Sequence, residues 1–228
     1  MKLTDRLLKI ASLVDDGKRV ADIGTDHGYI PVYLLNEGVV PFAILADVNK
    51  GPLENASKEV RYNKLTDKTD LRLGSGIEVL EQGEVDEVII AGMGGILISE
   101  LLEAKKEVSN TVEKLILQPM QAQEELRKYL LSNGYEILNE VLVKEDFRVY
   151  EIIVTKYTGK NTEIQDEVYF EVGTKLIENK DPLLKEFLDK KIYKYNSVIE
   201  KLEGKSGEAI DKKREESKAV IEKLKKLI

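Results

Sequence analysis

Short apolar runs alternate with amphipathic stretches along the first 132 residues. The apolar runs have the length of buried strands and end near glycine, proline or aspartate. The stretches between them repeat apolar residues every three or four positions, which is typical of helices that cover a sheet. The pattern predicts strands over residues 19–24, 42–47, 70–74, 85–93 and 114–117, and helices over residues 3–15, 29–36, 53–62, 96–106 and 124–132, with a helical turn up to residue 80.

Two further apolar runs, 135–144 and 148–156, follow with only residues 145–147 between them. A connection this short joins antiparallel strands, because a parallel pair needs a crossover of a dozen residues or more. We therefore predict an α/β, Rossmann-like doubly wound sheet that an antiparallel last strand closes at one edge. By analogy, such a last strand is more typical of class I methyltransferases than of dehydrogenases.

After Tyr157 the pattern is helical only, over residues 163–179, 182–203 and 207–227. The polar segment 157–161 separates the two kinds of pattern. We predict two domains, residues 1–158 and residues 159–228, the second an all-helical, coiled-coil-like domain whose last two helices form an antiparallel hairpin.

Composition excludes several kinds of site. The 228 residues include no cysteine and a single histidine, His27, so disulfides, thiolate chemistry and a polyhistidine metal centre are excluded, and we expect no metal. No apolar run approaches the roughly 18–20 residues of a membrane span, and the first residues lack a signal-peptide pattern. We expect a cytoplasmic protein without a membrane partner.

Charge is unevenly distributed along the chain. The net charge is −7, yet residues 160–228 carry 16 basic against 15 acidic residues. Because local patches matter more than the total charge, this segment is a candidate for binding a polyanion, and a packing or dimerisation arm is the alternative interpretation. The candidate contacts are Lys190, Lys191, Lys212, Lys213 and Arg214, with a further basic run at 223–226.

A glycine-containing turn follows the first predicted strand and precedes a helix. Its spacing is Gly24-x-x-x-Gly28 rather than the G-x-G-x-x-G of dinucleotide sites. Asp47 ends the second strand, where an acid can bind a ribose hydroxyl. Nicotinamide dinucleotides and S-adenosylmethionine both present a ribose, so these residues alone leave the cofactor open. Ser75, after the third strand, is either an adenine contact or part of a plain turn.

Three glycines close the fourth predicted strand in Ile90-Ala-Gly-Met-Gly-Gly95. Glycines at the end of a central strand indicate that a ligand or another backbone approaches closely. Class I methyltransferases place the target base at this position. The chain has no Asn/Asp-Pro-Pro-Tyr/Phe sequence here, which serves exocyclic amines, so a ring nitrogen is the favoured target.

These motifs, taken in order, resemble the bacterial tRNA (adenine-22-N1)-methyltransferase family, and the resemblance covers essentially the whole chain. Two departures are visible: Ser75 replaces an expected acidic residue, and Phe147 an expected glycine. The matching segments are Asp22-Ile-Gly-Thr-Asp-His-Gly28, Asp47 with Gly51-Pro52-Leu53, Arg72-Leu-Gly-Ser-Gly76, Ile90-Ala-Gly-Met-Gly-Gly95, Leu117-Gln-Pro119, and Glu145-Asp146 with Tyr150-Glu151.

The resemblance implies methylation of N1 of adenine 22 in tRNA with S-adenosylmethionine, by a monomer or weak homodimer. The implied cofactor-binding residues are Asp22, Gly24, Thr25, Gly28, Asp47, Val48, Ser75, Gly76, Ile77 and Gly92. The implied catalytic residues are Asp26, His27, Met93 and Gly94, and Arg6 and Tyr29 are expected at the substrate entrance.

Some alternatives stay open. Asp26 contacts either the target adenine or the amino group of the cofactor, and His27 either stacks on the base or is satisfied within its own turn. Competing functions are a small-molecule methyltransferase and a non-catalytic tRNA-binding protein. A nicotinamide-dependent oxidoreductase is disfavoured by the glycine spacing.

Overall fold

The computed structural model describes residues 3–228. The chain divides after Glu163 into two compact units, the second of which is Ile164–Ile228. The connecting segment after the last strand belongs to the first unit by its hydrogen bonds. The backbone N–H of Thr158 donates to Gly134 O at 2.8 Å, and that of Thr162 donates to Leu131 O at 2.8 Å. The two units are described separately below.

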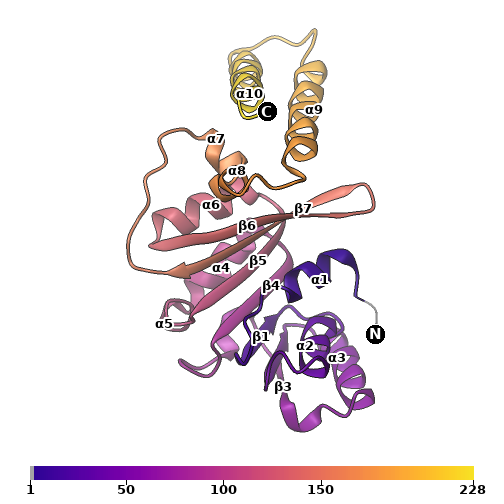
Figure 1. Cartoon of the computed structure of the whole chain (residues 1–228). Helices are drawn as coiled ribbons and strands as arrows, with labels where there is room; N and C mark the ends of the chain where they lie inside the picture. Colours follow the sequence, from indigo (N-terminus) through magenta and orange to yellow (C-terminus); the bar gives the residue numbers. More distant parts are fainter. Residues whose placement is uncertain (1–2) are drawn as a thin grey trace. The chain divides into compact units, whose positions relative to one another are not determined.

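A seven-stranded sheet in the order β3-β2-β1-β4-β5-β7-β6 forms the centre of the first unit (Figure 1). β1 to β5 are parallel, and β7 is antiparallel to both β5 and β6. This confirms the predicted Rossmann-like sheet with an antiparallel last strand. The strands are β1 (Val20–Ile23), β2 (Ala43–Asp47), β3 (Thr69–Leu73), β4 (Glu87–Gly94), β5 (Lys114–Gln121), β6 (Tyr135–Glu145) and β7 (Arg148–Tyr157).

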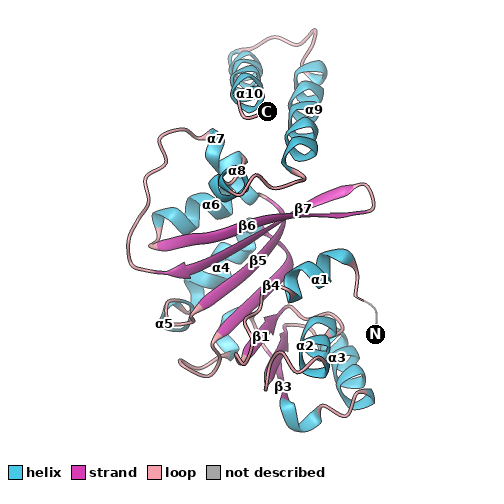
Figure 2. Ribbon diagram, in the orientation of Figure 1, coloured by secondary structure: helices cyan, strands magenta, loops and turns pink. Residues whose placement is uncertain are grey.

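Helices cover both faces of this sheet, and the long β6–β7 hairpin extends beyond the other strands (Figure 2). Side chains of α1, α2 and α3 form one apolar core with β1, β4 and β5, while α4, α5 and α6 lie on the other face. The helices are α1 (Asp5–Ala11), α2 (Tyr29–Asn36), α3 (Lys50–Tyr62), α4 (Gly95–Ala104), α5 (Lys106–Ser109) and α6 (Gln123–Ser132), with 3-10 turns η1 (Thr66–Lys68) and η2 (Gly76–Val79).

Two element boundaries in the first unit differ from the prediction. The helix predicted over residues 3–15 ends at Ala11, because the Ser12 hydroxyl donates to Lys9 O and 3-10 hydrogen bonds close the last turn. β5 continues past the predicted end at residue 117. Pro119 is tolerated there since it pairs with Met93, where the β4–β5 register is already irregular.

The second unit is helical, with α7 (Val168–Glu171), α8 (Thr174–Glu178), α9 (Leu184–Lys201) and α10 (Glu208–Lys225). The single helix predicted over residues 163–179 is wrong. Val172 is extended, with φ −127° and ψ 109°, and it precedes Gly173; both residue types have low helix propensity. α9 begins later than predicted because the Asp181 carboxylate accepts the Leu183 N–H and forms a turn. α9 and α10 pack against each other.

A buried ion cluster joins α6 to the last two strands. Arg127 of α6 is only 1% exposed, and its guanidinium donates to Glu140 of β6 at 2.7 Å and to Glu151 of β7 at 2.6 Å. Burial alone would lower the pKa of Arg127, but the two carboxylates outweigh it and hold the pKa above its usual value. The cluster fixes the hairpin against α6.

We predict that Arg127→Met destabilises the protein by about 3–5 kcal/mol, because it leaves two buried carboxylates without their cation. Denaturant unfolding followed by circular dichroism measures the loss. The exposed Arg148 supplies the control, since Arg148→Met should change stability by about 0.5 kcal/mol or less. Equal effects of the two substitutions would contradict the assigned role of the cluster.

Candidate active site

The turn after β1 is held against β2 by backbone hydrogen bonds. The N–H groups of Gly24 and Thr25 both donate to Ala46 O, at 2.8 and 3.0 Å. Gly24 has φ +79°, a left-handed conformation that favours glycine. A Cβ at Gly24 would lie 2.1 Å from Cε of Met93, so the Met93 side chain lies directly over the turn. The ends of β1 and β4 are therefore in contact.

The end of β4 is equally crowded on its other side. A Cβ at Gly95 would lie 2.2 Å from the carbonyl oxygen of Ala122, which follows β5. Gly94 pairs with Gln121, and the β4–β5 register shifts on both sides of Met93. The close approach of the Ala122 backbone thus explains why residue 95 is a glycine. The register irregularity means that the end of β4 does not continue the regular hydrogen-bond ladder with β5.

A cleft of about 380 Å³ opens where β1 and β4 end. The strand order reverses between these two neighbours, and open α/β sheets bind ligands at that point. The structure brings together these predicted residues as its lining: Arg6, Asp22, Gly24, Thr25, Asp26, His27, Gly28, Tyr29 and Gly92.

The other predicted cofactor residues lie outside the cleft lining, at the carboxyl ends of β2 and β3. One oxygen of Asp47 accepts the Asn49 N–H at 2.7 Å, and Val48 is 65% exposed. Ser75 is exposed, directly before η2, whereas Ile77 is fully buried. Gly76 has its Cα beside the Leu101 side chain.

Two of the residues predicted to be catalytic, Met93 and Gly94, are half-buried at the end of β4.

Asp22 is the buried acid of the cleft. Its burial raises its pKa to about 6; the Thr25 hydroxyl opposes part of this rise, and the charge of Asp47 adds to it. Within residues 3–228, no basic side chain forms an ion pair with Asp22, and the buried Thr25 Oγ1 makes no hydrogen bond of normal geometry. An unpaired acid beside an unpartnered hydroxyl fits a ligand that carries a cationic group and hydrogen-bonding atoms.

The cleft lining also has an aromatic wall, formed by His27 and Tyr29. The rings of His27 and Tyr29 stack with centroids 4.9 Å apart and an interplanar angle of 9°. Nε2 of His27 lies 3.4 Å from Oδ2 of the exposed Asp26. A flat surface with a carboxylate at its edge can hold a planar base and stabilise positive charge on it.

Arg6 enters the cleft from α1, held by residues that the sequence analysis did not select as site residues. Its NH1 group donates to Gln118 Oε1 at 2.7 Å, and its guanidinium lies 5.4 Å from the ring centroid of Tyr150. Its backbone N–H donates to Glu145 at 3.0 Å. Gln118, Glu145 and Tyr150 all lie in segments that match the family, and Gln118 is in addition a polar residue that interrupts an apolar strand.

Most of the predicted basic contacts in the second unit have acidic neighbours within that unit. Lys190 pairs with Glu186, Lys191 with Glu171 and Lys212 with Glu216. Arg214 pairs with Asp211 and also donates to the carbonyls of Leu202 and Lys205, which closes the loop between α9 and α10. Lys213 is exposed.

Two kinds of feature are absent from residues 3–228. No cluster of three or more histidine, aspartate or glutamate side chains in this part of the chain is arranged to hold a metal ion. No helix among the same residues has the length and apolarity needed to cross a membrane.

Comparison with known proteins identifies the family. A family model described as a methyltransferase domain matches residues 3–153. The tRNA (adenine(22)-N(1))-methyltransferase of Bacillus subtilis is 37% identical over 156 residues, which span 68% of this chain and 66% of that protein. The crystal structure of the B. subtilis m1A22 tRNA methyltransferase TrmK superposes with a TM-score of 0.88 and 32% identity, over 100% of this chain and 99% of that chain.

This chain belongs to the tRNA (adenine-22-N1)-methyltransferase family.

A further relative of this family shows a ligand. The structure of Mycoplasma capricolum TrmK in complex with the natural cofactor product S-adenosyl-homocysteine superposes with a TM-score of 0.83 and 28% identity, over 99% of this chain and 97% of that chain. Family membership confirms the resemblance that the ordered motifs indicate. It leaves the role of each individual side chain as a prediction.

We predict that ligand-free Asp22→Asn is more stable than the wild type at pH 7.5, by roughly 1–3 kcal/mol, since one pKa unit corresponds to about 1.4 kcal/mol. The folded-state pKa of about 6 exceeds the ordinary value of 3.8, so Asp22 stabilises the fold below pH 4 and this contribution is lost as the pH rises to 6. Denaturant unfolding of both proteins at pH 4.5 and 7.5 isolates the effect of this side chain. A stability difference that does not change with pH would contradict the prediction.

Proposed function

We propose that this protein transfers a methyl group from S-adenosylmethionine to N1 of adenine 22 in tRNA. The observation that carries the proposal is the cleft at the β1–β4 switch point, in a chain of this family. Its lining includes an aromatic wall and the buried Asp22, which has no ion pair among residues 3–228. A tRNA substrate implies that the protein works in the cytoplasm. We further propose a monomer or weak homodimer.

The cofactor supplies an electrophilic methyl group on a sulfonium. Gly24 and Gly28 leave the backbone of the turn open to its methionine part, and Asp22 offers a negative charge to its cationic groups. Asp47 keeps one carboxylate oxygen that the Asn49 N–H does not use, and it binds the ribose. Val48, Ser75, Gly76 and Ile77 border the adenine of the cofactor, and Thr25 and Gly92 complete its site.

The target adenine enters between the β4 end and the aromatic wall. Gly92, Met93 and Gly94 shape the slot, while His27 and Tyr29 support the ring of the base. The adenine must leave its stack in the folded tRNA, which costs a few kcal/mol, and the contacts with these residues offset that cost. Because N1 is already nucleophilic, the main task of the protein is alignment of the base.

Asp26 stabilises the positive charge that methylation places on the adenine. Its side chain is 76% exposed and adjoins His27, so it is free to meet the N6 amino group or N1. A carboxylate there stabilises the developing cation. The competing role for Asp26 is a contact with the amino group of the cofactor.

The decisive experiment maps the methylated position in unmodified tRNA incubated with the protein and S-adenosylmethionine. We expect 1-methyladenosine at position 22 and no product when position 22 is guanosine. S-adenosylhomocysteine should raise the melting temperature because it binds the native state, and NADH should not. Stabilisation by NADH alone would contradict the methyltransferase function, and a product at another position would contradict the proposed target.

Asp26→Asn should lower turnover by roughly 10²–10³, the scale of a lost charge-stabilising group, and leave cofactor affinity nearly unchanged. Single-turnover methylation and calorimetric titration with S-adenosylhomocysteine measure the two quantities. If the variant turns over normally at saturating cofactor but binds the cofactor weakly, Asp26 is a cofactor ligand only.

The helical unit is proposed to supply phosphate contacts through Lys190, Lys191, Lys212, Lys213 and Arg214. Ending the chain after Glu163 should preserve binding of S-adenosylhomocysteine, since every proposed cofactor residue precedes that point. It should weaken tRNA binding and flatten its salt dependence by roughly 0.7–0.9 in slope per lost contact. A dimerisation arm would instead change the sedimentation mass and leave the salt slope alone.

A further inference from the structure

The side-chain and backbone contacts of Arg6 come from one half of the sheet. Gln118 lies on β5, Tyr150 on β7 and Glu145 at the end of β6. Apart from Gly92, which lies on β4 itself, the proposed cofactor residues lie at or after the ends of β1, β2 and β3, on the other side of β4. Adjacent strands are about 4.8 Å apart, so β5 is about 10 Å from β1. Arg6 is thus held on the side of the cleft away from the cofactor half.

Gln118 has a fixed amide orientation. The residue is fully buried, and its Nε2 group donates to Pro119 O at 3.0 Å and to Met120 Sδ at 3.5 Å. Both of these neighbours are acceptors, so the amide nitrogen belongs on their side and Oε1 faces Arg6. Gln118 therefore holds the guanidinium with a neutral acceptor and leaves its positive charge intact.

Among residues 3–228, no ion pair neutralises the charge of Arg6. In the part of the chain that the structure describes, no carboxylate forms a salt bridge with its guanidinium, and its buried Nε has no hydrogen-bond partner. Glu145 accepts from the backbone N–H of Arg6. An arginine with an unused donor, at the lining of a cleft that also contains Asp22 and Asp26, is suited to an oxyanion ligand.

We propose that Arg6 binds a backbone phosphate next to the target nucleotide of the tRNA, and that Gln118 is the positioning residue that aims it. This inference rests on the proposed function. The methylated base becomes cationic, so a guanidinium beside it would oppose the reaction, whereas a phosphate is anionic throughout. Arg6 also gives an otherwise acidic cleft a local attraction for a polyanion.

Arg6→Ala tests the phosphate contact by equilibrium binding of unmodified tRNA to the protein saturated with S-adenosylhomocysteine, over a range of salt concentrations. We expect at least tenfold weaker binding and a salt slope shallower by about 0.7–0.9. The dissociation constant for S-adenosylhomocysteine should stay within twofold of the wild-type value. A matched control is Arg19→Ala, which removes an arginine paired with Asp86 before β1 and should leave both constants within twofold.

Gln118→Glu separates positioning from packing. The carboxylate keeps an acceptor for Arg6 and neutralises its charge, but it also sets an oxygen against Pro119 O, so the melting temperature should fall. Binding is therefore compared below the melting temperature of each variant, with S-adenosylhomocysteine binding as the check on folding, and we expect tRNA binding to fall as in Arg6→Ala. A purely structural Gln118 would make this variant bind tRNA like the wild type. Gln118→Met removes the acceptor and leaves the charge, so it should weaken binding by less and keep the wild-type salt slope.

Three outcomes overturn the inference. They are an unchanged salt slope in Arg6→Ala, wild-type tRNA binding by Gln118→Glu, and a loss of S-adenosylhomocysteine affinity in Arg6→Ala with tRNA binding intact, which would assign Arg6 to the cofactor carboxylate. Failure of the proposed function is distinguishable, because the wild-type protein itself would then neither bind nor methylate tRNA.

Discussion

The structure depends on the hydrogen bonds that fasten the turn after β1 to Ala46 of β2. These bonds hold Gly24 in a left-handed conformation, and Met93 packs into the space that a Cβ would occupy. The ends of β1, β2 and β4 are consequently fixed relative to one another before any ligand binds. The cleft is a product of this backbone arrangement, and its side chains come from a turn that has little freedom to move.

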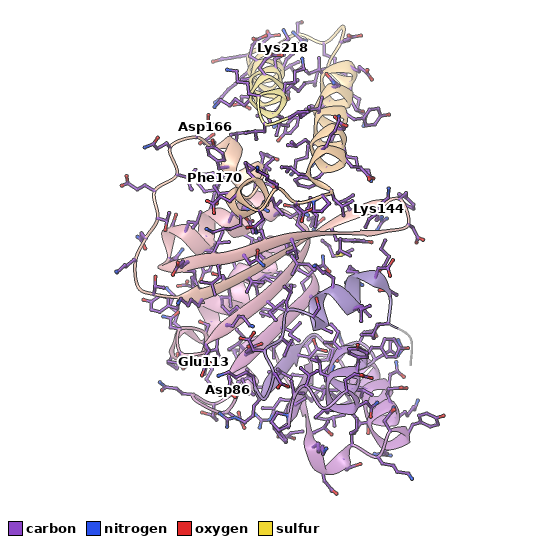
Figure 3. All side chains as sticks on the ribbon, viewed as in Figure 1. Asp86, Glu113, Lys144, Asp166, Phe170 and Lys218 are labelled. Atoms are coloured by element: carbon purple, nitrogen blue, oxygen red, sulfur yellow. The ribbon has the colours of Figure 1, made fainter. Side chains whose placement is uncertain are left out.

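Buried charges are treated differently in different parts of the first unit. Arg127 is satisfied by two carboxylates, and Lys114 at the start of β5 pairs with both Glu87 and Asp15. Asp86 and Glu113, labelled in Figure 3, lie side by side in the loops before β4 and β5. They are at the amino ends of these strands, whereas the cleft is at the carboxyl ends. Asp22 is the contrast, since it is buried, has no ion pair within the described residues 3–228, and has a pKa that burial raises. Such a group lowers stability, and functional sites are where it is tolerated.

The sequence predicts the sheet well because its strands are continuous apolar runs between turn residues. It also predicts the cleft between Asp22 and Tyr29, because these residues are contiguous in the chain. Gln118 and Tyr150 stand in segments that match the family, but the sequence does not predict their contact with Arg6. That contact depends on strand order, because β7 inserts between β5 and β6. The error over residues 163–179 has a local cause, an extended Val172 within an otherwise helical pattern.

The contacts of Arg6 also determine the order in which the two sides of the cleft can form during synthesis. Its hydrogen bonds join it to residues 112 and 139 positions later in the chain. The strands of the proposed cofactor half are made early during synthesis, but the partners of Arg6 leave the ribosome only with β5 to β7. The side of the cleft that holds Arg6 is therefore completed last, and a nascent chain that has made only β1 to β4 lacks it. Long-range contacts of this kind also slow folding, because loop closure must precede them.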